Sequence, residues 1–281
     1  MSVSRVWEDD EVAPELRRIF GEVRSSFGLP FVPTLFKLLA GVPGYLRPMW
    51  NDLGAVARSR EFQSAGKAME EFVRALAVAG AWRFSDQQRL LAGQEFSPGD
   101  VEQLGNIAAT FARLACRMAL FTRLMQKGYS GGQTGRVTNG VEISALARLL
   151  TLHVPPESEA GLRVWLIYSD IKRTLGARHV LSMYRVLSPF PAYLAAVWLD
   201  SKKMLSEPAF LRARDEVVKR ANGLVLGLPV KDHRAAAKNL DPKQWRAIEE
   251  AVDSQARLTF LFCLLSAVWH RSFSGAGRIA A

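Results

Sequence analysis

A repeat within the chain constrains its fold more than any other feature of the sequence. Residues 19–65 match a stretch that lies 148 residues further on, without a gap. The matched positions include two tryptophans, Trp50 and Trp198, and two prolines, Pro43 and Pro191. Other identical pairs are Ile19 and Ile167, Gly28 and Gly176, Tyr45 and Tyr193, and Asp52 and Asp200. We therefore interpret the protein as an internal duplication of two helical repeats that pack as a pseudo-dimer.

The spacing of apolar residues favours helices throughout the chain. Residues 16–27 carry an apolar stripe at intervals of three and four, and Gly28 follows it. The stretches Ser97–Asp100 and Asp241–Gln244 each place a capping side chain before a proline, which is typical of a helix start. No segment alternates apolar and polar residues as a half-buried strand does. The sequence therefore predicts an all-α fold.

The same pattern predicts the division of the chain. We expect a first helical repeat at 14–128 and a second at 161–272. Between them, residues 129–160 read as a glycine-rich linker followed by a short helix at 141–152.

Composition narrows the function classes. The net charge is +10, but the basic residues are scattered and match no nucleic-acid-binding signature. The longest apolar run, 258–269, is too short to span a bilayer, and the N-terminus does not resemble a signal peptide. The four histidines and two cysteines lack metal-ligand spacing. We expect a cytoplasmic protein with buried free thiols, without a metal, and without nucleic-acid or membrane partners.

Equivalent polar residues in the two repeats are candidates for a site. Thr34 and Ser182 each fall in the first turn of a predicted short helix, where free N–H groups attract anions. The alternative is that both hydroxyls only cap their helices. Asp200 and its equivalent Asp52 could be paired acids at a cleft, or each could pair with a nearby base such as Lys202.

Two predicted long helices add further candidates. Arg113 and Arg117 stand one turn apart on the first, and Asp253 and Gln255 lie on the second. Within a cavity an arginine could bind a carboxylate, whereas placement at the surface is the alternative.

The first repeat resembles the group I 2-haloacid dehalogenases, which act on both D- and L-substrates. The resemblance rests on residues 22–24, 29–32, 39–40 and 43–46 and on Trp50. It implies an all-α fold of two related repeats around a buried site, and cofactor-free hydrolysis. In that family an aspartate of the second repeat activates a water, which attacks C2 and displaces halide.

The sequence departs from this family at the catalytic position. The family's aspartate falls at Met183, beside Leu181 and Ser182, and the thioether of methionine cannot accept a proton. The stretch 172–199 holds no acid that could replace it. A site asparagine falls near Ala112, whereas Phe31 matches an aromatic residue of the family's site.

From these residues we expect a 2-haloacid dehalogenase-like protein that removes halide from a small 2-halocarboxylic acid without a cofactor. Its base would be Asp253 or Asp200, and its substrate-binding residues would be Phe31, Thr34, Arg113, Ser182, Met183 and Gln255. One alternative is different chemistry on a small apolar substrate; another is a non-catalytic binding or scaffold protein. A homodimer is compatible with each.

Overall fold

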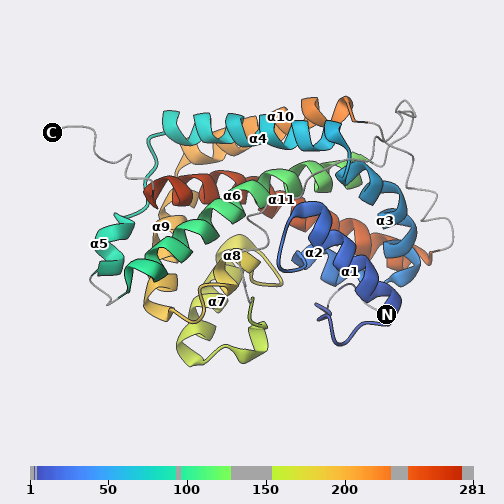
Figure 1. Cartoon of the computed structure of the whole chain (residues 1–281), viewed down its shortest axis with the longest axis horizontal. Helices are drawn as coiled ribbons and strands as arrows, with labels where there is room; N and C mark the ends of the chain where they lie inside the picture. Colours follow the sequence, from blue (N-terminus) through green and yellow to red (C-terminus); the bar gives the residue numbers. More distant parts are fainter. Residues whose placement is uncertain (1–2, 4, 93–95, 128–153, 229–239, 274–281) are drawn as a thin grey trace. The chain divides into compact units, whose positions relative to one another are not determined.

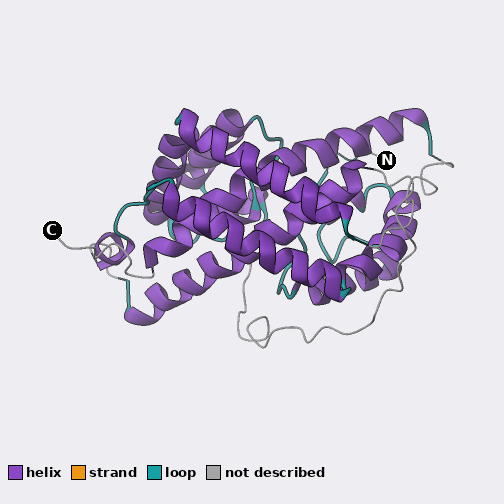
Figure 2. Ribbon diagram, turned by 90° about the horizontal axis from the view of Figure 1, so that it is seen from above, coloured by secondary structure: helices purple, strands orange, loops and turns teal. Residues whose placement is uncertain are grey.

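The structure is a computed structural model that describes residues 3, 5–92, 96–127, 154–228 and 240–273. Throughout these residues the regular structure is helical, and Figures 1 and 2 show no strand among them. The all-α prediction is therefore confirmed for the described part of the chain.

The first and second parts of the chain follow the same order of helices. α1 and α7 each have 14 residues, and α3 and α9 each have 15 and begin at a proline. One short helix lies between α1 and α3, and another lies between α7 and α9. The helices are α1 (Pro14–Phe27), α2 (Thr34–Leu39), α3 (Pro43–Ala57), α4 (Arg60–Ala79), α5 (Gln87–Ala92), α6 (Pro98–Lys127), α7 (Leu162–Leu175), α8 (Ser182–Arg185), α9 (Pro191–Leu205), α10 (Pro208–Leu226) and α11 (Pro242–Phe273), with a 3-10 turn η2 at Glu157–Glu159.

Several predicted boundaries need correction. The sequence pattern predicts a short helix at about 181–188, but α8 ends at Arg185, because residues 186–189 form turns. The pattern also predicts a helix from Pro208 to about Asn222, but α10 continues to Leu226. α5 was not predicted, since six residues are too few to show a clear period. The predicted linker at 128–140 and short helix at 141–152 lie outside the described residues.

Glycine ends the first helix of each half in the same way. Gly28 has a φ of 65° and Gly176 a φ of 58°, both in the left-handed region. The N–H groups of Gly28 and of the next residue bond back to carbonyl oxygens of α1, and Gly176 and its successor do the same on α7. A side chain at either position would be strained, so glycine is the residue that fits this helix end.

The chain forms two compact units, each assembled from three segments. The first unit comprises 1–67, 120–154 and 221–257; the second comprises 68–119, 155–220 and 258–281. Four helices, α4, α6, α10 and α11, contribute residues to both units. The predicted repeat boundaries describe similarity along the sequence and do not coincide with these units.

Aromatic side chains form the core of each unit. In the first, the ring of Phe36 meets that of Trp50 edge-on, with centroids 5.4 Å apart at 89°. In the second, Tyr184 and Trp198 occupy the equivalent positions, 5.4 Å apart at 84°. The matched geometry explains why these aromatic residues recur at a fixed spacing.

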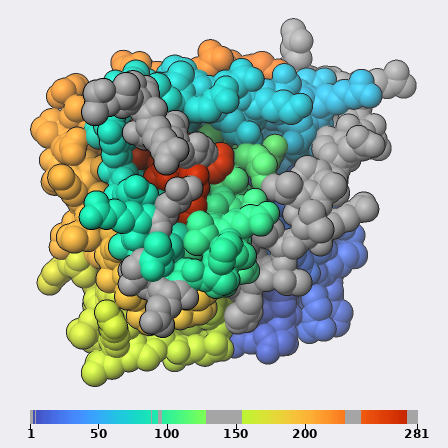
Figure 3. Space-filling view, turned by 60° about the vertical axis from the view of Figure 1, so that its left-hand side comes forward, coloured from blue at the N-terminus to red at the C-terminus, as the bar shows by residue number. Residues whose placement is uncertain are grey.

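α11 carries most of its apolar surface inward. Its most apolar window has a mean hydropathy of 1.3, and 61% of that window is buried, as in the core helix of a soluble protein. By length and composition alone it is long and apolar enough to cross a membrane, which is weak support for a span. Cys263 of α11 and Cys116 of α6 are close enough to raise the pKa of the Cys116 thiol, and both thiols are free and buried, as predicted. On the face drawn in Figure 3, α11 (red) reaches the surface over a small area.

Candidate functional site

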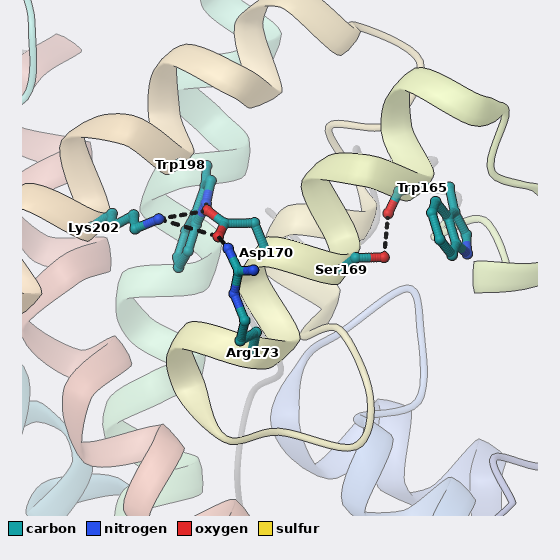
Figure 4. Close-up of polar contacts among 6 residues, drawn as sticks. All are labelled: Trp165, Ser169, Asp170, Arg173, Trp198 and Lys202. Carbon is teal, nitrogen blue, oxygen red and sulfur yellow. Dashed lines mark hydrogen bonds and ion pairs between the residues drawn. The ribbon is translucent and has the colours of Figure 1, made fainter.

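In each unit a tryptophan binds an acid, on α1 in the first unit and on α7 in the second. The Trp50 Nε1–H donates to Glu22 at 2.8 Å, which joins α3 to α1. The Trp198 Nε1–H donates to Asp170 at 2.8 Å, which joins α9 to α7 (Figure 4). Both bonds span 28 residues of sequence. The repeated tryptophan therefore has a polar role in addition to its place in the core.

Asp170 is the more strongly bound of the two acids. Lys202 donates to its two oxygens at 2.8 and 3.1 Å, and Arg173 donates at 2.6 Å (Figure 4). The bonds from Lys202 and Trp198 hold the pKa of this carboxyl well below its usual range, with Arg173 adding to the effect. Lys202 thus pairs with Asp170 rather than with Asp200. A carboxylate engaged in this way stabilises the packing of α7 against α9.

An ion pair joins α1 to the segment that precedes it, and another joins α7 to the segment that precedes it. Arg24 pairs with Asp9 in the first unit, and Lys172 pairs with Glu157 in the second at 3.0 Å. Glu157 also accepts from the N–H of Val180 at 2.6 Å, just before α8. These contacts fix the loop from which the short helix begins.

Each short helix carries a buried cation. The cation of α2 contacts the segment before α1, and the cation of α8 contacts the segment before α7. Lys37 of α2 is 7% exposed and ion-pairs with Glu8. Arg185 of α8 is 2% exposed, and its Nε–H donates to the carbonyl oxygen of Pro155 at 2.8 Å. A buried charge is tolerated only when it is paired or hydrogen-bonded, so these bonds hold α2 and α8 in place.

The first turns of these short helices are where the sequence placed candidate residues. Thr34 and Ser182 are the first residues of α2 and α8, as predicted. They do not cap their helices, because the N-cap residues are Pro33 and Leu181 and no side-chain capping bond is made. Thr34 and the preceding Phe31 are buried, whereas Ser182 is half-buried.

Asp200 is engaged with the segment before α5. It accepts hydrogen bonds from the Ser85 N–H at 2.8 Å and from the Ser85 hydroxyl at 3.2 Å. Gln87 donates to the Ser85 carbonyl oxygen at 2.6 Å and accepts from the Tyr193 hydroxyl at 2.6 Å. The Trp269 Nε1–H donates to Tyr193 at 3.0 Å. A chain of hydrogen bonds therefore runs from the half-buried Asp200 into the core.

The sequence did not predict this chain of bonds. Gln87, Tyr193 and Trp269 are almost fully buried, so burial raises the pKa of the Tyr193 phenol, and the nearby charge of Asp200 adds to the rise. Gln87 lies on the unpredicted α5 and is 106 residues from Tyr193 in sequence. The internal repeat could single out Tyr193 as a candidate, but nothing in the sequence pairs Tyr193 with Gln87.

The candidates on the long helices lie in different units. Asp253 is exposed in the first unit, where Gln126 donates to it at 2.8 Å, and Gln255 is half-buried nearby in sequence. Arg113 is half-buried in the second unit. Burial lowers the pKa of its guanidinium; Glu70 opposes this change, and Arg117 adds to it. No group of three possible metal ligands occurs among the described residues.

Comparison with known proteins identifies the family. Residues 30–184, over half of the chain, match the family model described as "Halocarboxylic acid dehydrogenase DehI". The chain belongs to the DehI family. This range includes α2 and α8, whose first turns carry Thr34, Ser182 and Met183.

Two curated relatives bear the name (R)-2-haloacid dehalogenase. The protein from Pseudomonas putida is 22% identical over 228 residues, which cover 76% of this chain and 73% of that protein. The protein from Rhizobium sp. (strain NHG3) is 22% identical over 239 residues, which cover 82% of this chain and 90% of that protein. The names refer to (R)-acids, so activity on both enantiomers remains a prediction for this chain.

Solved structures of D-2-haloacid dehalogenase share the fold of this DehI-family chain. A complex with L-LA superposes with a TM-score of 0.85 at 19% identity and covers 96% of this chain and 97% of that one. A mutant in complex with D-2-CPA superposes with a TM-score of 0.79 at 20% identity and covers 96% and 94%. The all-helical fold extends over nearly the whole length of both.

The departures from the DehI-family pattern persist in three dimensions. Met183 is 2% exposed in α8, so the position assigned to the catalytic aspartate holds a buried thioether. Ala112, near the position assigned to an asparagine, is half-buried on α6. Neither side chain can accept a proton from water.

The predicted site residues are divided equally between the units. The first unit holds Phe31, Thr34, Asp253 and Gln255, and the second holds Arg113, Ser182, Met183 and Asp200. The hydrogen bonds described above join Asp200 and Asp253 to residues outside this set. The roles of all eight residues therefore remain proposals.

Proposed function

We propose that this chain is a 2-haloacid dehalogenase-like hydrolase that replaces the halogen of a small 2-halocarboxylic acid by water, without a cofactor. The observation that carries the proposal is the family match from 30 to 184, which takes in both short helices. The names of the curated relatives supply the substrate class.

The proposed reaction makes limited demands on the protein. The water oxygen forms a bond to C2 while the carbon–halogen bond breaks, and halide leaves with the electron pair. The water proton passes to a base, and the product is a 2-hydroxy acid. Since halide is a good leaving group, the protein must supply only a base, an oriented water and a hold on the substrate carboxylate.

The base must come from a residue other than Met183. Of the two acids predicted from the sequence, we favour Asp200, because it is half-buried and two bonds from Ser85 fix its orientation. Asp253 is exposed on α11, where bulk water surrounds it. In the second unit, where Asp200 lies, we assign Met183 to an apolar contact and Ser182 to a polar contact with the substrate. Phe31, Thr34 and Gln255 remain candidate substrate-binding residues of the first unit.

Halide release from D- and L-2-chloropropionate tests the proposal. We expect the native protein to release chloride from at least one enantiomer. Asp200→Asn should abolish this activity, whereas Asp52→Asn, at the equivalent position of α3, should leave it intact. If Asp253→Asn abolishes it instead, the base is Asp253. No chloride release by the native protein from either enantiomer would refute the hydrolase proposal.

A second candidate function follows from the buried thioether. Met183 and Ala112 remove a carboxylate and an amide from the positions that the family resemblance assigns to chemistry. The protein would then bind a small organic acid or apolar compound without turning it over, or act on it by different chemistry. If Met183→Asp releases chloride and the native protein does not, the second candidate function is favoured over the hydrolase function.

We also propose that the two halves arose by internal duplication into a pseudo-dimer. Support comes from the matched glycine caps, tryptophan–acid bonds and aromatic pairs at a spacing of 148 residues. We infer a cytoplasmic location from the sequence and from the largely buried α11.

We further propose a homodimer that uses α7. Leu162, Trp165 and Leu166 lie on one face of this helix and are 75%, 53% and 56% exposed. The equivalent positions of α1 hold a proline and two arginines. The exposed apolar area is roughly 350 Å², a large part of the apolar core of a standard interface of about 800 Å² per partner.

A further inference from the structure

Two arginines of α6 stand out because the structure leaves their hydrogen-bonding capacity largely unused. Arg113 and Arg117 are one turn apart and both are half-buried in the second unit. The Nε–H of Arg117 is buried without a hydrogen-bond partner. Among the described residues, Arg113 makes no hydrogen bond or ion pair. Buried donors are normally satisfied, so an unsatisfied one calls for a partner.

One carboxylate faces these two cations. Glu70 of α4 approaches Arg117 at 3.5 Å, which is a long contact for an ion pair, and it attracts Arg113 over a greater distance. Two guanidinium groups and one carboxylate leave a single excess positive charge. Since the arginines also repel each other, the cluster gains from the arrival of one negative charge.

The neighbouring histidine leaves the charge of the arginine cluster unchanged at pH 7. His270 of α11 has its pKa lowered, first by burial and then by the Arg113 guanidinium, so the imidazole is neutral at pH 7. Among the described residues, Glu70 is the acid that contributes to the shift in the pKa of Arg113. Partial burial weakens screening by salt, so an anion here interacts more strongly than at an exposed arginine.

We propose that Arg113 and Arg117 form a binding site for a small monocarboxylate, with Glu70 as the residue that orients Arg117. An arginine presents two parallel N–H groups that match the two oxygens of a carboxylate. Such a ligand would satisfy the Arg117 Nε–H and neutralise the excess charge. A dicarboxylate would overcompensate the charge, so the site selects acids with one carboxyl group.

This inference deepens the proposed function, because a 2-halo acid and its 2-hydroxy acid product are both small monocarboxylates. It rests on that function only for the identity of the ligand. Binding can be measured with lactate, which has no halogen to lose, and so it does not depend on turnover.

Titration calorimetry of the full chain with sodium lactate, at constant ionic strength, tests the site. We expect the native protein to bind D- or L-lactate. Arg113→Gln should weaken binding by about tenfold to a hundredfold, the usual effect of losing a charge-assisted pair. Arg113→Lys, which keeps the charge but not the fork, should fall between the two. Lactamide, the neutral analogue, should not bind.

Arg123→Gln is the matched control, because Arg123 lies on the same helix and is hydrogen-bonded to Asn222 and to Gln126. It should bind lactate as the native protein does. Circular dichroism of each variant excludes loss of fold as the cause of weaker binding. The inference is overturned if native protein binds neither enantiomer, or if folded Arg113→Gln binds as tightly as native protein. Lactate binding that depends on Arg113, in a protein that releases no halide, would support this site and refute the hydrolase proposal.

Discussion

Replacing Trp198 by phenylalanine should destabilise the protein by an amount that the structure allows us to work out. The indole Nε1–H donates to the ionised Asp170 at 2.8 Å, and a hydrogen bond to a charged group contributes about 1.5–3 kcal/mol. The loss lies toward the lower end, because Lys202 and Arg173 remain bound to the same carboxylate.

The change also leaves a cavity. Trp198 is 5% exposed and packs edge-on against Tyr184, so losing part of the indole costs about 1–2 kcal/mol. The two contributions sum to about 3 kcal/mol. For a protein of this size we expect the Tm to fall by about 6–12 °C. Differential scanning calorimetry or circular dichroism at pH 7 measures this fall.

Trp165→Phe is the matched control on the neighbouring helix. Trp165 is 53% exposed, and Figure 4 shows it apart from the bonds to Asp170. At a protein concentration low enough to dissociate the proposed α7 dimer, an exposed substitution of this kind changes stability by less than about 0.5 kcal/mol. A Trp198→Phe protein whose Tm lies within 2 °C of native, or a Trp165→Phe protein that is equally destabilised, would refute the reasoning.

The same contact makes a prediction about pH. Because the folded state lowers the pKa of Asp170, the ionised carboxyl stabilises the fold above the ordinary aspartate pKa of about 3.9. This contribution is lost as the pH falls from there toward the lower pKa of the folded state. Asp170→Asn should therefore be less stable than native protein at pH 7, and the difference should shrink below about pH 4. A difference in Tm that stays constant from pH 7 to pH 3 would contradict the assignment.

Three further outcomes are expected. Gly176→Ala should lower stability by about 1 kcal/mol because its φ is positive, whereas Gly21→Ala, inside α1 where an added Cβ meets open space, should not; urea denaturation distinguishes them. Cys116 and Cys263 should resist a thiol reagent until the protein unfolds, because both are buried; rapid modification of native protein would contradict this. Trp165→Arg should shift the sedimentation coefficient from dimer to monomer, and a native protein that sediments as a monomer would exclude the α7 interface.

Local signals in the sequence predicted the helices well. The Ser97 hydroxyl accepts from the Asp100 N–H at 3.2 Å, and the Asp100 carboxylate accepts from the Ser97 N–H at 3.0 Å, so the predicted cap is confirmed. The glycine ends of α1 and α7 are confirmed in the same way. These features depend on neighbours within a few residues, which a single sequence displays directly.

Contacts between distant segments could not be predicted. Asp200 and Ser85 are 115 residues apart in sequence, and nothing in either segment signals the pairing. The absence of an acid at Met183 was visible in the sequence, whereas the residue that could replace it depends on which helices meet. The bond between Trp198 and the half-buried Asp170 spans 28 residues, and nothing in the sequence signals it.

The sharing of α4, α6, α10 and α11 between the two compact units has a consequence for gene fragments. A chain that stops after α6 carries the first segment of each unit and a small part of the second segment of the first unit. A chain that starts at α7 carries most of the second segment of the second unit and the third segment of each unit. Deleting one copy of the repeat would therefore leave neither unit complete. Under the proposed duplication, an ancestral single copy would have needed a second molecule to supply the missing helices, and fusion of two copies would have made that partner permanent.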